Sequence, residues 1–125
     1  MTESLIEAAR GVVSHSYSPY SNFSVGAAIE WSNGVVTTGV NVENKSYGLT
    51  QCAERSAVTA GISSGCNEIV AVAIWVDCEE PVCPCGACRQ VLQEFSEPSG
   101  SLQIVVACPG GKDIFFLKDL LPHPF

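Results

Sequence analysis

Cys85 and Cys88 are the first residues of this chain with a spacing suited to chemistry. They form a Cys-x-x-Cys motif that follows Pro84 and opens a predicted helix, so both sulfurs face one point near a helix N-terminus. The helix dipole favours the thiolate form there, and thiolates are the form of cysteine that zinc binds. By itself the motif is equally compatible with a redox pair or with buried structural cysteines.

A second cysteine motif favours the metal interpretation. Cys52-Ala53-Glu54 stands at the start of another predicted helix. If both helices begin at the same edge of a sheet, Cys52, Cys85 and Cys88 can surround one ion at about 2.3 Å per sulfur and leave a fourth tetrahedral position for water. Glu54 would then turn its carboxylate toward that position and shuttle a proton. The alternative is a solvated helix-surface charge, the usual state of a glutamate; the neighbouring Cys52 favours the catalytic role.

The chain is short and acidic. Its 125 residues predict one domain, residues 1–125, and 13 acidic against 6 basic residues give a formal charge of −7. Because proteins bind nucleic acids and anionic lipids mainly through Lys and Arg, we expect neither partner. The apolar run 69–76 is far shorter than the roughly 20 residues of a membrane-spanning helix. The composition predicts a soluble protein that acts on a small molecule.

Cysteine usage predicts a reducing compartment. The chain has 7 cysteines, an odd number that does not suit a secreted disulfide framework. Its first residues, MTESLIEAAR, lack the basic start and apolar stretch of a secretory signal. We therefore expect a cytoplasmic protein with free or metal-bound thiols.

Hydrophobic periodicity predicts an α/β fold. Apolar residues at helical spacing indicate helices over 5–13, 51–63 and 85–95, with Thr50 as a possible N-cap of the second. Residues 23–31 and 35–42 flank Asn33-Gly34 and predict an antiparallel hairpin. The β-branched run 69–76 is typical of a central strand buried on both faces.

The last two strands are predicted over 104–108 and 113–117. A helix separates the first of them from the strand at 69–76, which allows a parallel crossover, whereas the connection at 109–112 is too short for one. The final pair must therefore be antiparallel. Together these elements predict a three-layer α-β-α domain with a five-stranded mixed sheet.

Two motifs carry a family resemblance: C-A-E-R-S-A at 52–57 and P-C-G-A-C-R-Q-V at 84–91. They resemble the zinc-dependent cytidine deaminases of the homotetrameric free-nucleoside type, in the three-cysteine form where Cys52 takes the place of a histidine. Further similar segments lie at 17–28, 41–47 and 120–125, so the resemblance spans nearly the whole chain.

The resemblance implies hydrolytic deamination of cytidine and 2′-deoxycytidine to the uridine nucleosides and ammonia, in pyrimidine salvage. It implies one Zn²⁺ per chain on Cys52, Cys85 and Cys88, and Glu54 as the group that carries a proton from water to N3 and then to the departing amine. Arg55 is expected to donate hydrogen bonds to the ligand sulfurs and so to offset the negative charge of three thiolates.

The resemblance also implies a nucleoside-binding set. Asn41 and Glu43 are expected at the ribose hydroxyls, the N–H of Ala53 at the base oxygen, and Phe23 against the ring, with Tyr47 in the same binding segment. It further implies a homotetramer with shared active sites, in which Phe125 reaches a neighbouring pocket. As alternatives, Asn41 and Asn44 are ordinary turn residues.

The sequence is also compatible with two other functions. One is a deaminase of another cytosine nucleoside such as blasticidin S, against which the segment Asn41-Val42-Glu43-Asn44 argues. The other is a non-enzymatic binding module stabilised by zinc, in which a fourth ligand such as Cys83 closes the site. Glu54 would have no purpose in such a module.

Overall fold

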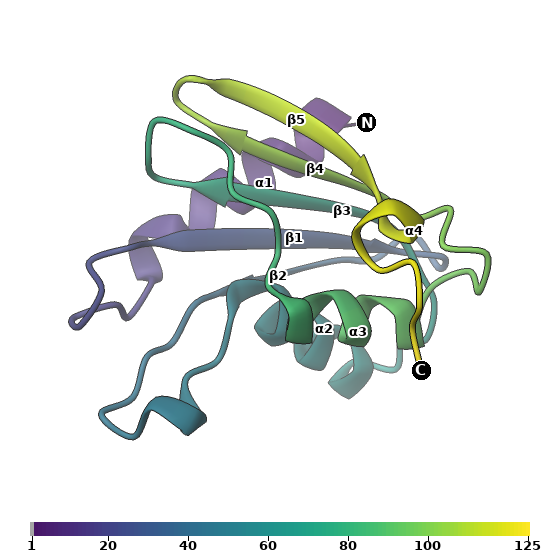
Figure 1. Cartoon of the computed structure of the whole chain (residues 1–125), viewed down its shortest axis with the longest axis horizontal. Coiled ribbons are helices and arrows are strands. Elements are labelled where there is room, and N and C mark those ends of the chain that lie inside the picture. The colour runs from purple at the N-terminus through teal and green to yellow at the C-terminus, as the bar shows by residue number, and fades with distance from the viewer. Residues whose placement is uncertain (1) are drawn as a thin grey trace.

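A computed structural model describes residues 2–125. One five-stranded sheet with the order β2-β1-β3-β4-β5 forms its middle layer (Figure 1). The strands are β1 (Val25–Trp31), β2 (Val36–Val40), β3 (Ile69–Val76), β4 (Gln103–Cys108) and β5 (Gly111–Phe116). The helices are α1 (Thr2–Val12), α2 (Ala53–Ser63), α3 (Gly86–Glu94) and α4 (Leu117–Leu120), with short 3-10 turns η1 (Val13–His15) and η2 (Tyr47–Leu49).

Strand directions confirm the predicted mixed sheet. β1 runs antiparallel to both β2 and β3, β3 runs parallel to β4 across α3, and β4 and β5 form an antiparallel hairpin. The Pro109-Gly110 turn is far too short to cross over, which forces this last pair to be antiparallel. β3 stands in the middle of the sheet, as predicted.

α1 covers one face of the sheet. Its Leu5, Ile6 and Ala9 pack on the small residues Ala28 and Ala73. This close approach requires Gly26 of β1, because a Cβ atom at that position would lie 2.2 Å from the carbonyl oxygen of Ala9.

α2 and α3 cover the opposite face and complete three layers (Figure 1). The larger core lies under them and includes Ile29, Trp31, Ile74, Leu92 and Ile104, all buried. Close packing of α2 against β2 also requires a glycine, because a Cβ atom at Gly39 of β2 would lie 2.4 Å from the Ala57 nitrogen. The absence of a side chain at Gly39 lets α2 lie directly on β2.

The predicted start of the second helix is wrong. The helix begins at Ala53 with Cys52, not Thr50, as its N-cap residue. Gln51 forms reciprocal 2.8 Å backbone hydrogen bonds with Val42, which keep the chain extended up to Cys52. The Thr50 hydroxyl accepts a hydrogen bond from the Asn44 backbone instead.

Two predictions near the strand ends also differ from the structure. β3 is not buried along both faces, since Val70 is 45% exposed. The last strand covers 111–116, not 113–117, and the chain then forms α4, which was not predicted. Leu117 leaves the strand because its side chain is fully buried in the α2–α3 core.

Candidate active site

The first turns of α2 and α3 bring three sulfurs together. Cys52 and Cys85 are the N-cap residues of the two helices, and Cys88 lies in the first turn of α3. The Cys85 sulfur lies 3.7 Å from that of Cys52 and 3.4 Å from that of Cys88. Tetrahedral zinc with bonds of about 2.3 Å holds its ligand sulfurs about 3.8 Å apart, so the cluster fits this metal.

Cys83 does not belong to this cluster. Within residues 2–125, Cys52, Cys85 and Cys88 form the one group of three or more His, Cys, Asp or Glu side chains whose ligand atoms all lie within 4.8 Å of one another. The structure therefore gives no support to a site closed by a fourth cysteine. Three protein ligands are the arrangement of catalytic zinc sites, which keep a position for water.

The electrostatics of the cluster favour a thiolate at Cys52. A hydrogen bond with Cys88, followed by hydrogen bonds from Arg55 and Cys85, lowers the pKa of Cys52 to about 5 despite its partial burial. The same Cys52–Cys88 contact, together with burial, raises the pKa of Cys88. The Arg55 guanidinium supplies positive charge directly, with its Nη2 3.4 Å from the Cys52 sulfur.

Glu54 follows Cys52 into the first turn of α2 and is 6% exposed. Burial raises the pKa of its carboxyl group to about 7. A carboxyl group with this pKa can take up and release a proton near neutral pH, which is the property required of a general acid and base.

Glu54 lines a cavity of about 350 Å³, together with Cys52 and Cys85 of the cluster and with Cys83. Its wall is formed by residues of the loops that precede β1, follow β2 and precede α3, together with the first residues of α2 and with Ile74 and Val76 of β3. Its lining is mostly apolar, with a few polar groups, as in sites for small organic ligands.

The structure brings most of the predicted binding residues to this cavity. Its wall includes the predicted residues Phe23, Asn41, Glu43, Tyr47 and Ala53. Phe125 is not among them, and its side chain is fully exposed at the end of the chain. Sequence reasoning did not single out Ser21, Gln51, Ile74, Val76 and Val82, which also line the cavity. Ser21 belongs to the similar segment 17–28, which offered a signal for it.

The Glu43 carboxylate is held by the loop before β1. Its Oε1 accepts hydrogen bonds from the backbone nitrogens of Tyr20, at 3.0 Å, and Ser21, at 3.1 Å. Its Oε2 accepts a hydrogen bond from the Ser21 hydroxyl. The hydrogen bonds from Ser21 lower the pKa of Glu43, which keeps this carboxylate ionised.

Asn41 is buried, and its amide is largely occupied by the same loop. Oδ1 accepts hydrogen bonds from the Val25 nitrogen, at 3.0 Å, and from the Ser16 hydroxyl. Nδ2 donates to the Phe23 carbonyl at 2.7 Å. Asn41 therefore anchors the loop, and one amide N–H is left over.

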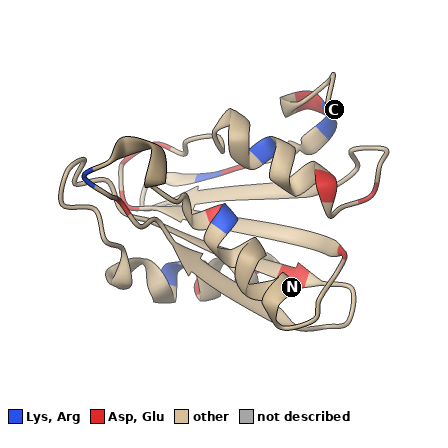
Figure 2. Cartoon of the chain, turned by 90° about the horizontal axis from the view of Figure 1, so that it is seen from below, with Lys and Arg blue, Asp and Glu red and all other residues tan. Residues whose placement is uncertain are grey.

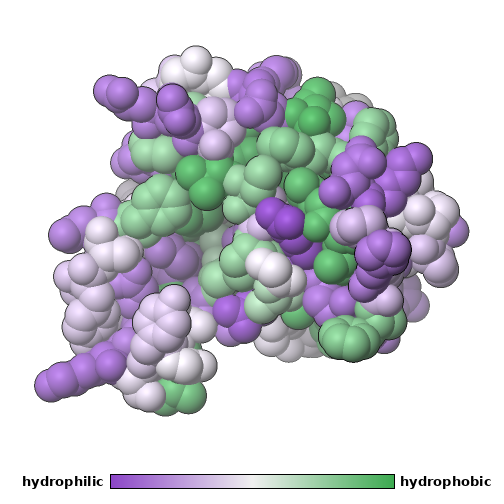
Figure 3. All heavy atoms as spheres, in the orientation of Figure 1, coloured by the Kyte–Doolittle hydropathy of each residue, from purple (hydrophilic) through white to green (hydrophobic). Residues whose placement is uncertain are grey.

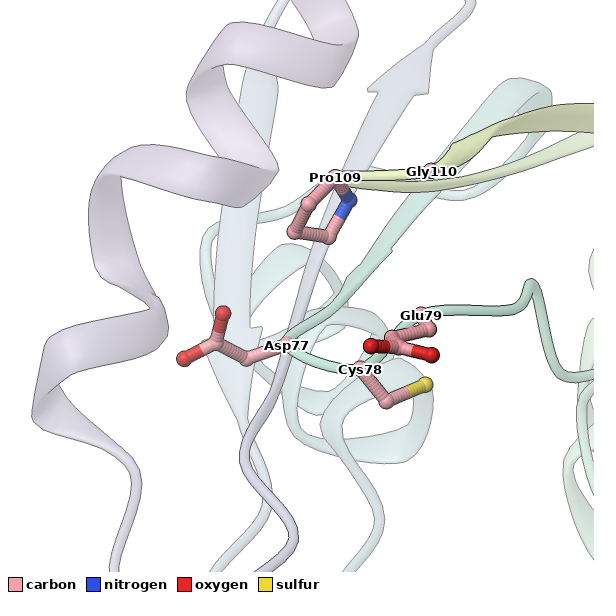
Figure 4. A pocket seen from close by; sticks show the side chains of 5 residues that line it. All are labelled: Asp77, Cys78, Glu79, Pro109 and Gly110. Carbon is pink, nitrogen blue, oxygen red and sulfur yellow. The ribbon is translucent and has the colours of Figure 1, made fainter.

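A second hollow lies at the ends of β3 and β4 (Figure 4). It measures about 600 Å³ and is lined by Asp77, Cys78, Glu79, Pro109 and Gly110. In Figure 4 the Asp77 carboxylate points away from the Cys78 sulfur and the Glu79 carboxylate. These groups do not converge on a common point, in contrast to the cysteine cluster.

Two further features concern nucleic-acid and membrane binding: where the basic residues lie and how long the helices are. The basic residues lie in separate segments of the ribbon (Figure 2). None of the helices in residues 2–125 combines the length and the hydropathy needed to cross a membrane.

Comparisons with known proteins agree with this geometry. Residues 1–102 match the family model for the cytidine and deoxycytidylate deaminase zinc-binding region. Cytidine deaminase of Sporosarcina psychrophila is 44% identical over 124 residues, 98% of this chain and 90% of that protein. Cytidine deaminase of Halalkalibacterium halodurans is 44% identical over 109 residues, 87% of this chain and 82% of that protein.

Solved structures show the same likeness. The crystal structure of cytidine deaminase from Burkholderia pseudomallei is similar with a TM-score of 0.92 at 41% identity, covering 100% of this chain and 99% of that one. The enzyme from Mycobacterium tuberculosis has a TM-score of 0.83 at 41% identity, covering 98% of this chain and 95% of that one. The cysteine cluster, the fold and these relatives together show that the chain belongs to the cytidine and deoxycytidylate deaminase family of zinc-binding proteins.

Proposed function

We propose that this protein is a zinc-dependent cytidine deaminase, which converts cytidine and 2′-deoxycytidine to the corresponding uridine nucleosides and ammonia. One observation carries the proposal: the buried Glu54 carboxyl group lines a nucleoside-sized cavity beside a cluster of three cysteine sulfurs. Cys52, Cys85 and Cys88 would hold the metal.

Glu54 moves the protons of this reaction. When bound, zinc supplies acidity to a water molecule, whose pKa it lowers toward neutrality. Glu54 accepts a proton as the water oxygen adds to C4 of the cytosine ring, and it passes that proton to N3. It then takes a second proton from the hydroxyl group now on C4 and transfers it to the amino group as the C4–N bond breaks, so that the C4 carbonyl forms and ammonia leaves. Burial of Glu54 and its raised pKa support both proton transfers.

The free hydrogen-bonding capacity of Glu43 and Asn41 supports both nucleosides as substrates. With Oε1 saturated, Glu43 has one acceptor site left on Oε2, and Asn41 has one N–H left. One acceptor and one donor match one sugar hydroxyl, which both donates and accepts. Cytidine and 2′-deoxycytidine share the 3′-hydroxyl of the sugar ring, so recognition of this hydroxyl is compatible with both substrates.

Charge disfavours phosphorylated substrates. The ionised Glu43 lines the cavity and would repel a phosphate there, and the net charge of −7 opposes polyanions in general.

We extend the proposal to pyrimidine salvage in the cytoplasm. The free cysteines among the described residues support a reducing compartment.

Exposed apolar groups support a homotetramer with shared active sites. Tyr47 lines the cavity and yet is 89% exposed, so the outer wall of the cavity is uncovered in a single chain. Leu49 and Phe125 are also strongly exposed, and apolar surface is visible across the face shown in Figure 3. Neighbouring copies would cover these side chains and complete the pocket.

The direct test follows cytidine absorbance in the ultraviolet after addition of the purified zinc-loaded protein. We expect cytidine and 2′-deoxycytidine to be consumed with release of ammonia, and cytidine monophosphate and single-stranded DNA to be poor substrates. Removal of zinc with a chelator should stop turnover, and its return should restore it. Failure of the zinc-loaded protein to consume either nucleoside would refute the proposal.

A further inference from the structure

Among the described residues 2–125, Ser21 is the one that contacts both carboxylate oxygens of Glu43, through its backbone nitrogen and its hydroxyl group. Its hydroxyl accepts a hydrogen bond from the Phe23 backbone nitrogen at 3.0 Å and donates its proton to Oε2 of Glu43. A serine hydroxyl has a single proton, so the hydrogen bond from Phe23 leaves that proton directed at Glu43. Ser21 also lines the same cavity as Phe23 and Glu43.

The intervening residue makes this double contact possible. Asn22 has a φ of 58°, in the left-handed region that asparagine tolerates better than most residues. Its backbone nitrogen donates to the Ser18 carbonyl at 3.0 Å, which closes the turn. The turn brings the Phe23 nitrogen back to the Ser21 hydroxyl, so the orientation of that hydroxyl follows from the loop.

We propose that Ser21 is a positioning residue that determines sugar specificity, by setting how Glu43 presents its remaining acceptor site. The inference rests on the proposed function, in which Glu43 binds a sugar hydroxyl. With the Ser21 hydroxyl in place, both carboxylate oxygens of Glu43 are held and one lone pair of Oε2 is free. Without it, a mobile water molecule takes the place of the hydroxyl at Oε2, and the carboxylate can turn about the hydrogen bonds to Oε1.

Exposure separates this role from a purely structural one. The Ser21 side chain is exposed, and so is the adjoining Asn22. A hydrogen bond that is open to water contributes little to folding, because water replaces it in the variant. Loss of the hydroxyl should therefore leave the fold and the cysteine cluster intact and change mainly the recognition of the sugar.

The test compares cytidine with 2′,3′-dideoxycytidine, which keeps the base and lacks both ring hydroxyls. For the wild-type protein, kcat/KM should strongly favour cytidine, because the analogue leaves Glu43 and Asn41 unpaired. In Ser21→Ala this preference should fall by about tenfold through the KM of cytidine, while kcat and zinc content stay near those of the wild type. Ser21→Thr, which keeps a hydroxyl, should restore the preference.

Ser24→Ala is the matched control. Ser24 lies in the same loop and its hydroxyl contacts Ser18 at 3.2 Å, away from Glu43. We expect Ser24→Ala to keep the wild-type preference for cytidine. If Ser21→Ala does not fold, Ser21→Gly takes its place in the comparison. An unchanged preference in the Ser21 variant, or an equal loss of kcat/KM for both nucleosides, overturns the inference. Wild-type protein that does not consume cytidine overturns the proposed function instead.

Discussion

The guanidinium group of Arg55 lies beside the sulfur of Cys52, with 3.4 Å between Nη2 and Sγ. The two residues are three positions apart in the sequence, which places them on neighbouring turns of the same helical start. Three thiolates around Zn²⁺ carry a net charge of −1, which would oppose ionisation of water. Arg55 offsets this charge from within the same helix.

Arg55→Gln should remove the positive charge that offsets the negative charge of the three thiolates. The amide keeps some hydrogen-bonding capacity and loses the charge, so we expect kcat or zinc affinity to fall by about 10- to 100-fold. Chelator competition and steady-state kinetics on the same preparation check both. Arg10→Gln is the control, because Arg10 stacks on Trp75 away from the site. Equal effects of the two substitutions would contradict the assigned role.

Glu54→Gln should separate proton transfer from metal binding. The amide has nearly the same shape as the carboxyl group and cannot shuttle a proton, so kcat should fall by about 10²- to 10⁴-fold or more. Zinc content, measured by metal analysis, should remain near one per chain. Near-normal turnover by this variant would remove Glu54 from the mechanism.

Cys85→Ser and Cys83→Ser should differ in zinc content. Cys85 is a member of the cysteine cluster, and Cys83 lies two residues before it and outside the cluster. We expect Cys85→Ser to lose zinc and Cys83→Ser to retain it, as measured by atomic absorption after dialysis. The opposite result would show that Cys83 is a ligand.

Gly39→Ala should destabilise the protein through α2. The added Cβ atom would lie 2.4 Å from the Ala57 nitrogen, so α2 has to move away from β2. We expect a loss of about 1–3 kcal/mol in the free energy of unfolding, measured by urea denaturation. Gly48→Ala adds a Cβ atom with nothing within 4 Å and serves as the control. A stable Gly39→Ala variant would show that this contact can relax.

Deletion of Phe125 tests the shared active site. Its backbone nitrogen donates to Oε1 of Gln90 at 3.2 Å, while its side chain is fully exposed. If Phe125 covers the pocket of a neighbouring chain, the deletion should raise the KM of cytidine, and light scattering should show a tetramer for the native protein. A monomeric native protein, or unchanged kinetics after the deletion, would argue against shared sites.

The sequence by itself determined the local elements and the chemistry of the motifs. Helices and strands followed from periodicity because it reflects which side chains of one element face the core. The Cys-Ala-Glu and Cys-x-x-Cys motifs indicated a metal because ligand type is a local property. Local patterns failed at Thr50, where pairing of Gln51 with Val42 delayed the start of α2 to Ala53.

Only the tertiary structure decided which distant residues meet. Cys52 and Cys85 lie 33 positions apart and come within 3.7 Å because α2 and α3 begin at the same edge of the sheet. Ser21 and Glu43 lie 22 positions apart, and no short-range pattern links them. These contacts depend on long-range packing, for example the close packing of α2 against Gly39 of β2. This packing is a property of the whole fold rather than of any single segment.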